Sequence, residues 1–407
     1  MNPTLKKILG LIISIILIGG MIYARVQLST GFDYQNSNFA FFWLAGKMTI
    51  DGENPYVETT YLANHEKYGI KWQPNRIFPY PLPLAILCIP LGFFSMGDAY
   101  IIWQVVSLIF VAISIYILLN ISNNEATKRL LIPIFLAMLF FGPEYLTLYT
   151  GAIGAFTLLI LAIAVYLLEK ENFIFAGILL ALTMLKPPQG LTILALASLW
   201  FLIKKNWKAI IGIGIGGVLL LVIGLIQDPE WIQKFLGAGD AVLDRTQGVH
   251  SNVWAFGYLI CNGETTCSRL LGAALSLSLL GGAGYLLWKN QTKWSDWEAM
   301  NLIIPIGFVS TIYLWAYDQI TFIIPIVWVT SMLVQKSRNY FYSFLFLILL
   351  IIVSLFALVQ QALTDKDLWS LGTTILVLLF LFITIKMKTK KATETTEVNE
   401  KKLSESL

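Results

Sequence analysis

Charged residues are scarce in this chain of 407 residues: only 13% are Asp, Glu, Lys or Arg, whereas 57% are hydrophobic. A soluble domain carries about 25% charged residues. The composition therefore excludes an ordinary soluble enzyme and a disordered protein. The mean hydropathy of +0.72 and the length are sufficient for roughly ten or more membrane spans of about 20 apolar residues each. We expect an all-α, polytopic integral membrane protein.

Histidine and cysteine are also rare, with two and three residues respectively. These numbers exclude a multi-histidine metal site, a haem relay and a cysteine-rich cluster. We therefore predict neither a metal nor a cofactor. The net charge is only +4, and no basic block indicates a nucleic-acid partner.

Twelve apolar runs are long enough to cross a bilayer and carry few internal charges. The first follows Lys6 and Lys7 but lacks a small-residue cleavage site, which favours a retained anchor over a signal peptide. The runs comprise residues 8–24, 98–120, 129–147, 151–169, 173–186, 189–204, 207–227, 268–289, 297–316, 319–335, 340–362 and 367–387.

The distribution of charge gives the orientation. With both termini placed in the cytoplasm, the inner segments hold 18 of the 28 Lys and Arg residues but only 9 of the 24 acidic residues. This asymmetry agrees with the positive-inside rule. Residues 37–50 and 80–94 are apolar but broken by Gly or Pro, and we expect them to be interfacial helices on the bilayer surface. Counting 80–94 as a crossing would spoil the asymmetry.

This topology predicts one membrane domain, 1–387, followed by a disordered cytoplasmic tail, 388–407. The outer face would carry a first loop at 25–97 and a second at 228–267. Cys261 and Cys267 fall outside, where a disulfide and two free thiols are both compatible with the sequence.

A glycine-rich run at 212–217 matches a dinucleotide fingerprint literally, but it lies inside a predicted span with no preceding strand. Close helix packing through small residues is the better interpretation.

Polar residues at predicted span ends on the outer face are the candidates for chemistry. Asp33 follows the first span and is read either as a general base at the lipid–water boundary or as a solvated cap. Lys186 ends a span and would either bind a lipid phosphate or only extend to the interface. Asp318 lies close to lipid depth, where ionisable groups are usually functional. The weaker candidates are the cations Arg76, Arg245 and His250, and the polar residues Glu144, Tyr80, Asn252 and Tyr317.

Several short motifs occur in a characteristic order. They are Asp33, Pro55-Tyr56, Tyr80-Pro81, Pro90 and Trp103, then Gly151-Ala152-Ile153-Gly154, Lys186-Pro187 and Tyr317-Asp318. Together they resemble glycosyltransferase family 87 over about residues 30–330. Ala152 and Leu82 depart from the family pattern, which more often has Gln and Pro at these positions.

The resemblance implies a GT-C-type fold with about twelve transmembrane helices. It also implies transfer of a sugar, with mannose as the expected one, from a polyprenyl-phosphate donor to a lipid or glycan acceptor at the outer face of the cell membrane. The linkage would form with inversion, and Asp33 would be the catalytic base. Lys186, Arg245, His250 and Arg76 would contact the donor phosphate, because a phosphate leaving group needs cationic donors.

Two other classes of protein are compatible with the sequence. Twelve spans also fit a transporter or lipid flippase, although no matching pair of Gly- or Pro-broken spans in two halves supports a transporter. An enzyme-like scaffold without activity is the third reading, which the departures at Ala152 and Leu82 allow.

Overall fold

The computed structural model describes residues 33–405 except 72–75, 122–123, 238–247 and 338–339. Every regular element in these ranges is a helix, which confirms the all-α prediction. The N-terminal elements are η1 (Tyr34–Asn36), α2 (Asn38–Ile50), α3 (Glu58–Lys67), α4 (Pro83–Leu87), α5 (Ile89–Gly92) and α6 (Met96–Ile121). The central ones are α7 (Glu125–Lys128), α8 (Leu131–Met138), α9 (Gly142–Thr150), α10 (Gly154–Glu169), α11 (Phe173–Ala181), η2 (Leu182–Leu185), α12 (Pro187–Ile203) and α13 (Trp207–Gln227). The C-terminal ones are α15 (Val253–Ile260), α16 (Thr265–Lys289), α17 (Asp296–Ser310), η3 (Ala316–Phe322), α18 (Ile323–Ser337), α19 (Phe341–Thr364), η4 (Asp367–Ser370) and α20 (Leu371–Glu405).

Among the described residues, six helices are long and apolar enough to cross a membrane. A seventh candidate is the pair Glu125–Met138 and Gly142–Thr150, which is bent by 62°. The apolar helices α10, α11 with η2, and α12 are shorter, at 10–17 residues. The chain is therefore a multi-pass membrane protein, while the twelve-span topology stays a prediction. Residues 8–24, the first predicted span, lie outside the described part.

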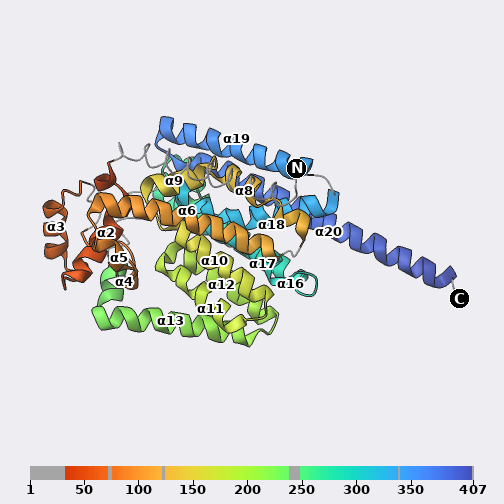
Figure 1. Ribbon diagram of the computed structural model, residues 1–407, viewed down its shortest axis with the longest axis horizontal. Coiled ribbons are helices and arrows are strands. Elements are labelled where there is room, and N and C mark those ends of the chain that lie inside the picture. The colour runs from red at the N-terminus through yellow and green to blue at the C-terminus, as the bar shows by residue number, and fades with distance from the viewer. Residues whose placement is uncertain (1–32, 72–75, 122–123, 238–247, 338–339, 406–407) are drawn as a thin grey trace, which may run out of the picture.

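The side chains form two hydrophobic cores. The larger one contains side chains of α6, α8, α10 to α13 and α16 to α20. The smaller one contains most of α2, with Tyr56, Phe78 and Leu84 around it. Figure 1 shows this second unit, α2 to α5, at one end of the molecule beside the ends of α6 and α13.

The first of the two predicted interfacial helices, 37–50, is buried inside the protein as α2. The side chains of α2 are buried from Asn38 to Gly46, so α2 has no face left for lipid headgroups. Its aromatic residues occur without helical periodicity and are buried on all sides, and Gly46 lets the backbone of α5 pack directly against α2. The 80–94 stretch forms α4 and α5, from which Leu87 and Phe93 remain exposed.

The glycine-rich run packs two helices together, as predicted. Gly212 and Gly216 lie against the backbone of α11, where a Cβ atom would clash. At the other end of the chain, α20 continues helically to Glu405 and projects from the rest of the molecule (Figure 1). The disordered cytoplasmic tail at 388–407 stays a prediction.

Candidate active site

A buried ion pair joins two of the predicted site residues. Lys186 Nζ lies 2.5 Å from Asp318 Oδ1, and the two side chains are only 5% and 1% exposed. Lys186 lies between η2 and α12, and Asp318 belongs to η3. The second carboxylate oxygen, Oδ2, accepts a hydrogen bond from the backbone N–H of Trp315 at 3.1 Å. A buried charge needs such a partner, because desolvation of an unpaired one costs several kcal/mol or more.

Aromatic rings surround this pair. Lys186 Nζ lies 4.8 Å from the centroid of the Tyr317 ring, close enough for a cation–π interaction. Tyr317 stacks on Trp315 with centroids 6.2 Å apart. Tyr80, from the first predicted outer loop, lies near Tyr313 and Asp318. A ring-lined polar site of this kind suits a sugar or a lipid phosphate better than a free ion.

His250 completes the ring system. Its imidazole is 4.6 Å from the Tyr313 ring and 4.8 Å from the Trp315 ring, between centroids. Burial lowers the pKa of His250 to about 4, and the positive charge of Lys186 contributes to the shift. At neutral pH the imidazole is uncharged. The sequence analysis grouped His250 with the cations, whereas the structure makes it a neutral hydrogen-bonding group.

Two residues hold the loop that carries His250. The side chain of Asn252 accepts the N–H of Ala255 at the start of α15 and donates to the carbonyl of Thr311 at 2.9 Å. The backbone N–H of Ser251 donates to the carbonyl of Leu314 at 3.0 Å. The loop is therefore fixed against the segment that leads into η3.

Asp367 was not among the predicted site residues; the sequence analysis includes it only as the first residue of the predicted span 367–387. Its carboxylate accepts the backbone N–H of Ala316 at 2.7 Å, and its own N–H donates to the carbonyl of Val249 at 2.8 Å. It thereby joins η4 to both segments of the site. An acidic residue at the start of an apolar span was the available signal, because such groups are rare at this depth.

Glu144 is fully buried in α9, which packs on η3. One turn further along α9, Thr147 donates through its hydroxyl to the carbonyl of Tyr317 at 2.8 Å. The Tyr56 hydroxyl donates to the carbonyl of Tyr80 at 2.5 Å, which ties the two Pro/Tyr motifs together.

Asp33 and Arg76 do not join this cluster. Asp33 forms an ion pair with Lys71 at 2.8 Å, and its side chain is 45% exposed. Arg76 pairs with Glu58 at 2.7 Å and is 78% exposed. Arg245 lies outside the described residues.

The Asp33 segment is linked to the site only indirectly. Tyr34 stacks on Tyr100 at 5.9 Å, and the Tyr100 hydroxyl donates to the carbonyl of Tyr149. The turn that follows Tyr149 leads to Gly154, which lies against the carbonyl of Tyr317.

The structure thus brings together Lys186, Asp318, Tyr317, His250, Asn252 and Tyr80, with Glu144 on a neighbouring helix. Within the described ranges, no group of three or more His, Cys, Asp or Glu side chains could hold a metal ion. The arrangement provides one buried cation and neutral hydrogen-bond donors, which together can bind a phosphate ester and stabilise it as a leaving group.

Comparison with known proteins identifies a family. The family model of glycosyltransferase family 87 matches residues 78–311, more than half of the chain. No curated protein and no solved structure matches the chain. The match begins at the Phe78-Pro79-Tyr80-Pro81 motif and includes Lys186 and the His250 loop.

Proposed function

Because the chain belongs to glycosyltransferase family 87, we propose that it transfers a sugar from a polyprenyl-phosphate donor to a lipid or glycan acceptor at the outer face of the cell membrane. Mannose is the proposed sugar, and the proposed architecture is a GT-C-type fold of about twelve spans with both termini in the cytoplasm. The buried Lys186–Asp318 pair with its aromatic surround is the observation that carries the proposal.

The reaction requires a cation at the leaving group. An acceptor hydroxyl forms the new bond to the anomeric carbon while the bond from that carbon to the phosphate oxygen breaks, with inversion. The bonding electrons go to the phosphate, whose added charge Lys186 stabilises by exchanging part of its contact with Asp318. His250, neutral at physiological pH, donates a hydrogen bond to the donor, and Arg245 and Arg76 are proposed as further phosphate contacts.

Asp33 is proposed as the base that accepts the proton of the acceptor hydroxyl. Its exposed pair with Lys71 costs little to break, so its carboxylate is accessible to an acceptor arriving from outside. The Lys186–Asp318 pair would bind the donor from the other side of the turn at Tyr149–Gly154. Asp318 itself remains the second acidic candidate.

The disulfide between Cys261 and Cys267 supports the proposed orientation. Disulfides persist in oxidising surroundings outside the cytosol. Glu264, between the two cysteines, caps the start of α16, and Ser276 of α16 donates to Ser310, immediately before the site segment. The helix that begins at the bonded loop thus also contacts the end of α17, next to the site.

Transfer of label from radiolabelled polyprenyl-phosphate mannose to membrane acceptors tests the proposal. We expect Lys186→Gln to reduce the turnover number at least about a hundredfold, as loss of a charge-stabilising group does. Asp33→Asn should abolish it, whereas Asp51→Asn, which also removes an exposed paired carboxylate of the first outer loop, should be neutral.

Full activity of Asp33→Asn would remove Asp33 from the base role. Movement of the labelled lipid across vesicles without any transfer would favour the transporter alternative instead.

A further inference from the structure

A second polar site lies at the end of the bundle opposite the Lys186–Asp318 pair. Three helices run from one site to the other: α10, α12 and α17. In α12, Lys186 precedes the first residue and Lys204 follows the last, so its 17 residues separate the two ends by about 25 Å. This distance is close to the hydrocarbon thickness of a bilayer. The second site is therefore separate from the proposed glycosyltransferase site.

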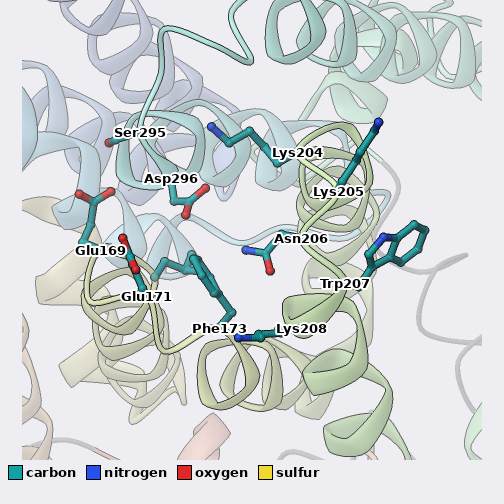
Figure 2. Close-up of a pocket in the computed structure, with 11 residues that line it drawn as sticks. Glu169, Glu171, Phe173, Lys204, Lys205, Asn206, Trp207, Lys208, Ser295 and Asp296 are labelled. Carbon is teal, nitrogen blue, oxygen red and sulfur yellow. The ribbon is translucent and has the colours of Figure 1, made fainter.

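The second site is a cavity of about 710 Å³ between three loops. These loops join α10 to α11, α12 to α13, and α16 to α17. Its walls differ in charge, because one loop supplies basic side chains and the other two supply acidic ones. Figure 2 shows Lys204 and Lys208 extending across the cavity toward Glu169, Glu171 and Asp296.

Two of the acidic side chains already have partners inside the protein. Asp296 accepts the indole N–H of Trp200 at 2.7 Å, and Glu169 accepts the backbone N–H of Trp297 at 2.8 Å. Glu171 is exposed and, among the described residues, makes no ion pair. It is the acidic group available to a ligand.

The basic wall also has capacity to bind. Lys204 Nζ donates one hydrogen bond, to the carbonyl of Gln291 at 3.0 Å, which leaves two of its three N–H groups. Lys208 is exposed and takes part in no ion pair that the described part of the chain contains. Both ammonium groups can therefore contact an anion without breaking the fold.

The position of the cavity defines where a ligand comes from. Trp207 lies between the two lysines in sequence, is 60% exposed and begins α13, a candidate membrane span. Tryptophan at the start of a span is typical of the headgroup layer. A ligand in this cavity therefore lies at the depth of phospholipid headgroups.

We propose that this cavity binds the headgroup of a membrane phospholipid that carries both a phosphate and a primary amine. The phosphate contacts Lys204 and Lys208, and the ammonium group donates to Glu171. A purely anionic headgroup leaves the acidic wall without a partner, and a quaternary amine has no N–H to donate.

Native mass spectrometry of the full-length protein in detergent tests this proposal. Dioleoyl phosphatidylethanolamine, the matched choline lipid and the matched glycerol lipid are titrated separately. We expect the ethanolamine lipid to bind tightest. The double variant Lys204→Gln/Lys208→Gln should raise its Kd about fivefold for each lysine, and Glu171→Gln should remove the preference over the choline lipid. Lys293→Gln, which changes an exposed lysine at the same end outside the cavity, should bind like wild type.

Two results would overturn the inference. One is equal binding of the three lipids to the wild type. The other is an unchanged Kd in the cavity variants while they retain the wild-type thermal midpoint. Soluble O-phosphoethanolamine serves as the last arm: if it binds as tightly as the lipid and with the same dependence on Glu171, the membrane origin of the ligand is wrong.

Discussion

Among the ion pairs of the described residues, Lys186–Asp318 and Lys71–Asp33 have similar chemistry but opposite surroundings. Lys186–Asp318 is enclosed by aromatic rings and almost fully buried. In Lys71–Asp33, by contrast, the side chains are 64% and 45% exposed. The exposed pair is screened by water and contributes little to stability. The buried pair holds two desolvated charges that depend on each other. The comparison shows that burial, rather than the N–O distance, decides how strongly a carboxylate depends on its cation for stability.

Breaking the buried pair should have the largest effect. Lys186→Met leaves Asp318 buried without its cation, and we expect a loss of about 3–5 kcal/mol in the free energy of unfolding. The thermal midpoint of purified protein in detergent measures it. The double variant Lys186→Met/Asp318→Leu should recover most of the loss, because it removes both charges. A single variant as stable as wild type would contradict the mutual dependence of the pair.

The surroundings of the buried pair can be tested through His250. Its folded-state pKa of about 4 lies below the usual value of 6.5, so the folded protein binds this proton less readily than the unfolded chain does. The neutral imidazole therefore makes a contribution to the free energy of unfolding that is fully present above pH 6.5. This contribution is lost as the pH falls toward 4, and the loss amounts to roughly 3 kcal/mol. Thermal midpoints of wild type and His250→Gln between pH 7 and pH 4 measure this. The wild type should lose more stability than the variant, and parallel curves would show that His250 is not buried as described.

Asp367 tests how the segments around the buried pair are held. Asp367→Ala removes the acceptor of the Ala316 N–H, and we expect a loss of about 1–3 kcal/mol. Asp367→Asn keeps a side-chain oxygen at this position and should be the milder change. Chemical denaturation of both variants gives the comparison. Equal losses would mean that the carboxylate charge, rather than the hydrogen bond, is the important property.

The exposed pair should respond least. Lys71→Gln is expected to change stability by less than about 1 kcal/mol, and added salt should reduce even this difference. The same thermal assay at low and high ionic strength measures it. A loss comparable to that of Lys186→Met would erase the distinction between the two pairs.

The sequence was sufficient to find most of the cluster. Lys186, Asp318 and Tyr317 stand out because ionisable and polar residues are conspicuous in an apolar chain, and the ends of predicted spans restrict where they can lie. The membrane class and the helix-packing glycines followed from hydropathy and spacing. Spacing could not show that Gly212 and Gly216 would face α11 while Gly214 and Gly217 have open space beside them.

The sequence could not place residues whose position depends on long-range packing. Asp33 belongs to a loop whose path follows from contacts such as Tyr34 with Tyr100, and nothing local indicates them. The aromatic residues of α2 fit a bilayer surface as well as a protein core, so its burial was not predicted. The sequence was also compatible with either a disulfide or two free thiols at Cys261 and Cys267, because the pairing of cysteines depends on the fold.

The two prolines that open α12 have a consequence for ligand selectivity. Helix starts commonly hold phosphate through free backbone amides, but Pro187 and Pro188 have no N–H, and the amides of Gln189 and Gly190 already donate to the carbonyl of Lys186. A negatively charged group entering here meets one movable side chain instead of a rigid cradle of amides. The site retains this group only when the Lys186 side chain turns away from the Asp318 carboxylate. The bound anion and Asp318 therefore compete for the same cation.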